Sequence, residues 1–91
     1  MNTTDTEIRS RIRSYITENF LYMRPDFALG DDDPLLERGI VDSMGVMEVL
    51  QFIEEEFGVQ AADDEITEEN LNSLDAITRF VSGKRSHSYA A

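Results

Sequence analysis

Ser43 is the residue of this sequence whose surroundings favour chemistry most clearly. It follows Asp42, which has the side chain of a helix N-cap residue, at the end of a long loop. A helix that begins at Ser43 would place the serine hydroxyl beside unpaired backbone N–H groups and the positive end of the helix dipole. A phosphate ester is well tolerated there, so Ser43 is a candidate attachment site. The alternative is an ordinary first-turn serine capped by Asp42.

The remaining residues argue against a catalytic site. The only histidine, His87, falls near the end of the chain, so a serine–histidine pair has no credible base. The sequence has no cysteine and no glycine-rich phosphate loop. Its carboxylates are expected on solvated faces rather than paired in a desolvated cleft. We therefore predict no catalytic residue and a protein that is not itself an enzyme.

A helix is predicted from Ser43 to Phe57, with Gly58 as its C-terminal signal, and it carries two stripes. The buried stripe is apolar and consists of Val46, Leu50, Ile53 and Phe57, with help from Met47 and Val49. The second stripe begins with a methionine beside the candidate serine, continues acidic, and consists of Met44, Glu48, Gln51 and Glu55. We predict that this second stripe docks a partner, and the alternative is a merely solvated face.

Helical periodicity recurs along the chain while strand alternation is absent, which predicts an all-α fold. A first helix opens at the capping-box spacing of Thr4 and Glu7 and ends near residues 21–23, before Pro25. Residues 24–41 form a long first loop. A short helix contains Leu71, and a last helix has Asn72 as its N-cap and ends at Gly83. We expect a domain over residues 1–83 and a flexible C-terminal tail over residues 84–91.

The net charge of −11 comes from 19 acidic and 8 basic residues, and it is unevenly distributed. Between Asp26 and Asp75 the only basic residue is Arg38. Such a field repels nucleic acid and anionic membranes and favours basic protein partners, although general solubility is an alternative reading. No stretch could span a membrane and no signal peptide is visible, so we predict a cytoplasmic protein.

The acidic run over residues 31–33 raises the question of calcium. If an EF-hand loop started at Asp31, its sixth position would be Leu36, where the loop needs glycine. Its twelfth position would be Asp42, where the loop needs glutamate. We therefore predict no metal site.

Three segments together resemble the acyl carrier protein superfamily: residues 35–44, 54–59 and 70–77, within a similarity that runs from Glu7 to Val81. The resemblance implies a four-helix bundle of acyl-carrier type with a short third helix and a long first loop. It also implies that residues 1–83 are a carrier domain. A phosphopantetheinyl transferase would attach 4′-phosphopantetheine from coenzyme A to Ser43 through a phosphodiester, and the thiol of that group would hold an acid as a thioester.

The resemblance also implies roles for other residues. Asp42 would contribute to recognition by the transferase and to magnesium binding. The side chains that would meet partners are Met44, Glu48, Gln51, Glu54 and Glu55. The expected partners are the transferase, a loading ligase, adenylating enzyme or acyltransferase, and downstream synthase or tailoring enzymes, with the carrier itself a monomer.

Departures from the family patterns narrow the expected cargo. Met44 and Gly45 follow the serine, where carriers of fatty-acid synthesis have leucine and an acid, and Val41 and Asp42 precede it, where modular peptidyl carriers have glycines. Ser43 to Gly45 is similar to D-alanyl carriers, but their tryptophan-containing pattern is missing after Val59.

We therefore predict a discrete carrier of secondary-metabolite biosynthesis, of nonribosomal peptide or polyketide type, which holds an acyl or aminoacyl group. Fatty-acid synthesis and D-alanyl transfer are the alternative pathways. The alternative function is a non-catalytic acidic helical adaptor that docks basic partners without a prosthetic group.

Overall fold

The computed structural model describes residues 4–24 and 26–90, with side chains as far as Arg85. These residues form four α-helices, one short 3-10 turn and no strand, which confirms the predicted all-α fold. The elements are α1 (Asp5–Phe20), α2 (Ser43–Phe57), η1 (Asp63–Glu65), α3 (Glu68–Leu71) and α4 (Leu74–Ala90). The short third helix and the long loop between α1 and α2 are as expected. Within the described ranges, no helix combines the length and the apolar character needed to cross a bilayer.

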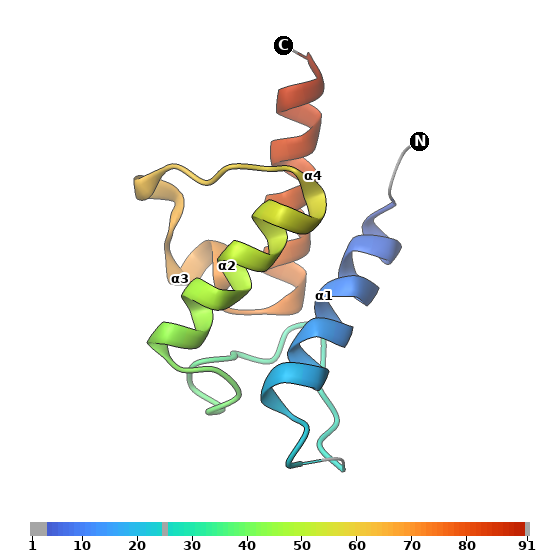
Figure 1. Ribbon diagram of the computed structural model, residues 1–91, viewed down its shortest axis with the longest axis vertical. Coiled ribbons are helices and arrows are strands. Elements are labelled where there is room, and N and C mark those ends of the chain that lie inside the picture. Colours follow the sequence, from blue (N-terminus) through green and yellow to red (C-terminus); the bar gives the residue numbers. More distant parts are fainter. Residues whose placement is uncertain (1–3, 25, 91) are drawn as a thin grey trace.

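The helices pack in a bundle in which α1 and α4 run in opposite directions (Figure 1). These two helices share the most extensive contact, α2 packs against both of them, and α3 packs against α4. The first turn of α1 and the last turns of α4 lie at one end of the bundle (Figure 1). The start of α2 lies at the other end, beside the first loop.

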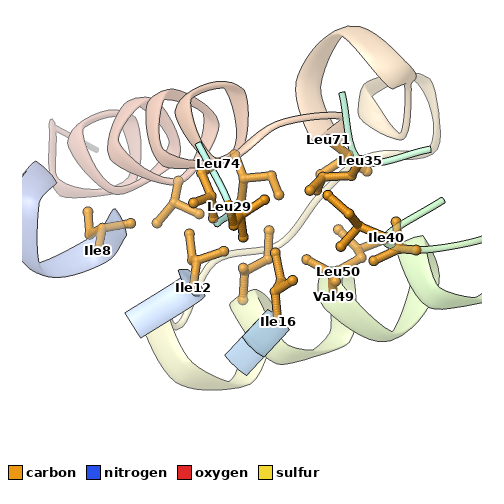
Figure 2. Close-up of a cluster of buried hydrophobic side chains, with 14 of the residues drawn as sticks. Ile8, Ile12, Ile16, Leu29, Leu35, Ile40, Val49, Leu50, Leu71 and Leu74 are labelled. Atoms are coloured by element: carbon orange, nitrogen blue, oxygen red, sulfur yellow. The ribbon is translucent and has the colours of Figure 1, made fainter. Parts of the chain in front are cut away.

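The core fills the space between α1, α2 and α4 with branched apolar side chains (Figure 2). Ile8, Ile12 and Ile16 recur at every fourth residue of α1, so they lie on one face of that helix, and each is at most 1% exposed. Opposite them are Leu74, Ile77 and Val81 of α4, together with Val49, Leu50 and Ile53 of α2. Each such side chain contributes about 1.5–3 kcal/mol when it is fully buried.

The first loop is fastened to the junction between α3 and α4. The Leu35 N–H donates to the Asn72 carbonyl oxygen at 2.8 Å, and the Leu36 N–H donates to Asn72 Oδ1 at 2.9 Å. The Asp75 N–H donates in turn to the Asp31 carbonyl oxygen at 2.8 Å. The loop also buries Leu29, Leu35, Ile40 and Val41. The apolar residues and these hydrogen bonds together give this long loop a defined path.

The three arginines of α1 make ion pairs within the chain. Arg9 pairs with Asp75 at 2.8 Å, Arg11 pairs with Glu56, and Arg13 pairs with Asp31. These pairs connect α1 with α4, with the end of α2 and with the first loop.

Two predictions for α2 and α4 are wrong at single residues. Met47 is 50% exposed and does not help the core, while Val46 is half-buried. The N-cap of α4 is Ser73, whose Oγ accepts from the Ala76 N–H at 3.0 Å, rather than Asn72. The side chain of Asn72 is engaged with the first loop instead, so it is not available as a cap.

Gly83 does not end the last helix, which continues to Ala90. Of the glycines in the described residues, only Gly39 and Gly58 have a positive φ, so Gly83 keeps a helical backbone. A glycine inside a helix costs about 1 kcal/mol relative to alanine, which weakens a helix without ending it. The next turn is held by an ion pair between Lys84 and Glu65 at 2.8 Å. The boundary at residue 83 and the flexible tail stay predictions; Ala91, Pro25 and the His87 side chain lie outside the described residues.

Candidate functional site

The first turn of α2 has the capped geometry that the sequence predicts. Asp42 is extended, and its Oδ1 accepts from the Gly45 N–H at 2.7 Å, while its carbonyl oxygen accepts from the Val46 N–H at 2.9 Å. Within the described part of the chain, the N–H groups of Ser43 and Met44 find no partner. Two free donors at the positive end of the helix dipole therefore lie beside the Ser43 side chain.

Ser43 is exposed and stands where two hollows of the surface meet. One is a groove of about 240 Å³ between the start of α2 and α3, and its lining is mainly apolar. This groove is lined by Ser43 together with Leu36, Val46, Met47, Ile66, Thr67, Glu68 and Leu71. The second hollow lies on the other side of Ser43, along Phe20 and residues 39–42.

The arrangement presents a hydroxyl without activating it. Among the side chains that the structure describes, none hydrogen bonds to the Ser43 hydroxyl as a general base would. The carboxylate of Asp42 holds the Gly45 N–H, which is the action of a cap. The described side chains therefore leave the Ser43 hydroxyl accessible and without a neighbouring group that would activate it.

Of the five side chains expected to meet partners, the four of the second stripe lie on the surface of α2, and Glu54 is the exception. Met44 is 79% exposed, and Glu48, Gln51 and Glu55 are exposed as well. Glu54 is half-buried, and its carboxylate accepts from the Ala61 N–H at 3.1 Å. Glu54 thus holds the loop after α2, while the other four side chains are available to a partner.

Tyr15 of α1 lies close enough to the acidic side chains of α2 for their charge to affect its pKa. Its ring stacks on Phe52 with a centroid distance of 4.2 Å, and its hydroxyl donates to the Glu48 carbonyl oxygen at 3.4 Å. Burial raises the pKa of Tyr15, and the nearby carboxylates of Glu48 and Glu55 raise it further. The acidic face of α2 therefore acts electrostatically on a neighbouring helix.

Two carboxylates of the acidic run over residues 31–33 make contacts within the chain. Asp33 accepts from the Gly30 N–H at 2.7 Å and pairs with Arg38 at 3.2 Å, while Asp31 pairs with Arg13. In the residues that the structure describes, no group of three or more potential ligands is arranged around a metal site.

Sequence reasoning missed the residues that reach the site from other elements. Ile66 and Leu71 line the groove beside Ser43, and Phe20 lines the second hollow. The Thr67 side chain accepts from the Asn70 N–H at 3.3 Å, which is a local signal for α3. No local signal, however, shows that α3 lies beside the start of α2, because that contact is made by tertiary packing.

Comparison with known families agrees with this geometry. Residues 10–81, well over half of the chain, match the family described as the phosphopantetheine attachment site. Among curated proteins, none matches the chain. Domains of the matching family are generally not catalytic, and they interact with phosphopantetheinyl transferases and with synthases. The resemblance seen in the sequence is confirmed: the chain belongs to the phosphopantetheine attachment site family, the acyl carrier proteins, whose covalent prosthetic group is 4′-phosphopantetheine.

Proposed function

We propose that Ser43 carries the 4′-phosphopantetheine and that the protein is a discrete carrier in secondary-metabolite biosynthesis, of nonribosomal peptide or polyketide type. The observation that supports this most directly is the exposed Ser43 hydroxyl at the capped start of α2, inside the matched region. When attached, the group supplies a thiol that holds an acyl or aminoacyl cargo as a thioester. Fatty-acid synthesis and D-alanyl transfer are the alternative pathways.

The residues around Ser43 fit a covalently attached phosphodiester. The unpaired N–H groups of Ser43 and Met44 offer donors to phosphate oxygens, as helix N-termini do. Asp42 keeps the turn closed through the Gly45 N–H, and we assign it the further role of helping the transferase to bind magnesium. The chain has no cysteine, and no side chain that the structure describes acts as a base on Ser43. The thiol and the chemistry therefore come from the prosthetic group and from partner enzymes.

The exposed face of α2 is the surface that we assign to partners. This face begins beside Ser43 with an apolar contact and continues along α2 with two carboxylates; it consists of Met44, Glu48, Gln51 and Glu55. Glu54 is only partly exposed, and one of its carboxylate oxygens accepts from the Ala61 N–H, so we assign only its exposed part to this surface. We propose that the face meets the transferase, a loading ligase, adenylating enzyme or acyltransferase, and a downstream synthase. A monomeric, non-catalytic carrier in the cytoplasm is part of the same proposal.

The test is the intact mass after incubation with coenzyme A, magnesium and a broad-specificity phosphopantetheinyl transferase. The unaltered protein should gain one phosphopantetheine and Ser43→Ala should gain none. Ser14→Ala, which removes an exposed serine from α1, is the matched control and should be modified like the unaltered chain. If a transferase that modifies another carrier leaves this protein unchanged, the adaptor function takes the place of the carrier function.

A further inference from the structure

Gly45 lies in the first turn of α2 and is enclosed by its neighbours. A Cβ at this position would stand 2.9 Å from Cε1 of Phe20, a distance that real Cβ atoms essentially never show. It would also stand 3.2 Å from Asp42 Oδ1 and 3.2 Å from Cβ of Val41. The glycine is therefore a point of close approach between α1, the end of the first loop and the start of α2.

None of these three neighbours is free to move away without a loss. Asp42 Oδ1 accepts from the Gly45 N–H at 2.7 Å, so displacing it would break the cap. The Val41 side chain is 4% exposed, and the atom that would be met is the one next to its backbone. The Phe20 ring packs edge-on against Tyr15, with a centroid distance of 6.1 Å.

The backbone of Gly45 does not require glycine. Its φ is not positive, unlike the φ of Gly39 and Gly58, so alanine could adopt the same conformation. Alanine is also the better helix former, so glycine here lowers the intrinsic stability of α2. The absence of a side chain at Gly45 instead leaves space for the Phe20 ring and the Asp42 carboxylate.

We propose that Gly45 is a positioning residue for Ser43. Because position 45 has no side chain, Phe20 packs directly on the first turn of α2 while Asp42 caps that turn from the loop. Held from both sides, the turn presents the Ser43 hydroxyl in one orientation, at the junction of the two hollows. The inference rests on the proposed modification of Ser43. It adds a role for Gly45, a residue to which we assign no contact with the prosthetic group or with the transferase.

The experiment compares the rates at which a purified phosphopantetheinyl transferase modifies the unaltered protein, Gly45→Ala and the double variant Phe20→Leu/Gly45→Ala. We expect Gly45→Ala to lower kcat by about tenfold to a hundredfold, as misplaced reacting groups do, with KM changed less. Phe20→Leu should recover most of this loss in the double variant, because the shorter side chain vacates the space that the new methyl group needs. Amide exchange at residue 45, whose N–H is held by Asp42, should be faster in Gly45→Ala and slow again in the double variant.

Gly83→Ala is the matched control, because a Cβ at Gly83 would have no neighbour within 4 Å. It should be modified like the unaltered protein. Modification of Gly45→Ala at the unaltered rate would overturn the inference while the carrier function stands. A loss that Phe20→Leu does not recover, accompanied by lost helix content, would also overturn it, since that is general destabilisation. If the unaltered protein is not modified at all, the carrier function is wrong. Amide exchange at residue 45 tests the inference separately: an unchanged exchange rate in Gly45→Ala would show that the added methyl group does not disturb the cap.

Discussion

Asp42 combines a backbone contact with a negative charge, and two substitutions separate them. Asp42→Ala removes the acceptor of the Gly45 N–H and should lower the free energy of unfolding by about 0.5–2 kcal/mol. Asp42→Asn keeps an acceptor of similar capping strength and should stay closer to the unaltered stability. Urea unfolding and the rate of phosphopantetheinylation are measured side by side. If the carboxylate helps the transferase to bind magnesium, Asp42→Asn should be modified slowly although it is stably folded. Modification of Asp42→Asn at the unaltered rate would show that Asp42 acts only as the helix cap.

Tyr15 links stability to alkaline pH. Its pKa in the folded protein is raised above the ordinary value of 10.0, so the unfolded chain loses this proton first as the pH rises. The stabilisation is therefore complete below about pH 10 and is lost as the pH rises through the folded pKa. Tyr15→Phe should show a shallower loss of unfolding free energy above that pH, measured by urea unfolding at a series of pH values. Tyr22→Phe alters a ring that is 68% exposed and is the control; identical slopes for Tyr15→Phe and the unaltered protein would contradict the prediction.

At the scale of the element, α2 has one face buried in the core and one exposed face, which we assign to partners. Glu48→Lys or Glu55→Lys reverses a charge on the exposed face and should weaken binding to a transferase with a basic docking surface, with the salt dependence of binding reduced. The melting temperature should change little, because both side chains are solvated. Glu18→Lys makes the same charge change on the exposed side of α1 and is the control. Equal effects from Glu18→Lys would mean that net charge, rather than the α2 face, governs binding.

The first loop depends on Asn72 for its position. Asn72→Ala leaves the partly buried Leu36 N–H without its acceptor and should lower the free energy of unfolding by about 1–3 kcal/mol. Urea unfolding measures the change. Asn19→Ala also removes a side-chain hydrogen bond, but an exposed one within α1, and should cost less. A loss for Asn72→Ala no larger than for Asn19→Ala would show that the apolar residues alone hold the loop.

Local signals in the sequence predicted the helices and their caps well, but they could not predict the contacts between elements. The caps at Thr4, Asp42 and Gly58 act on their own neighbours, so residue type and spacing were enough to identify them. Asn72 has the side chain of a cap but is used by a loop that is distant in sequence. The contact of Phe20 with Gly45 likewise depends on how α1 packs on α2, which no pattern within either helix contains.

At the scale of the whole molecule, the net charge of −11 sets the response to salt. The arginines of α1 are committed to ion pairs with acids of α2, α4 and the first loop, and the excess of acids leaves net self-repulsion. Salt screens both terms, but repulsion involves many more charges, so the melting temperature should rise as sodium chloride is added. A melting temperature that falls with salt would show that the ion pairs outweigh the repulsion.

The two ends of the bundle allow the protein to be anchored without covering Ser43. The first turn of α1 and the last turns of α4 face away from the start of α2 (Figure 1). A solid support or a fused protein joined at that end would leave the serine pointing outward. Because the polypeptide has no cysteine, one cysteine introduced there before the prosthetic group is attached would direct the coupling to a single atom and orient every molecule alike.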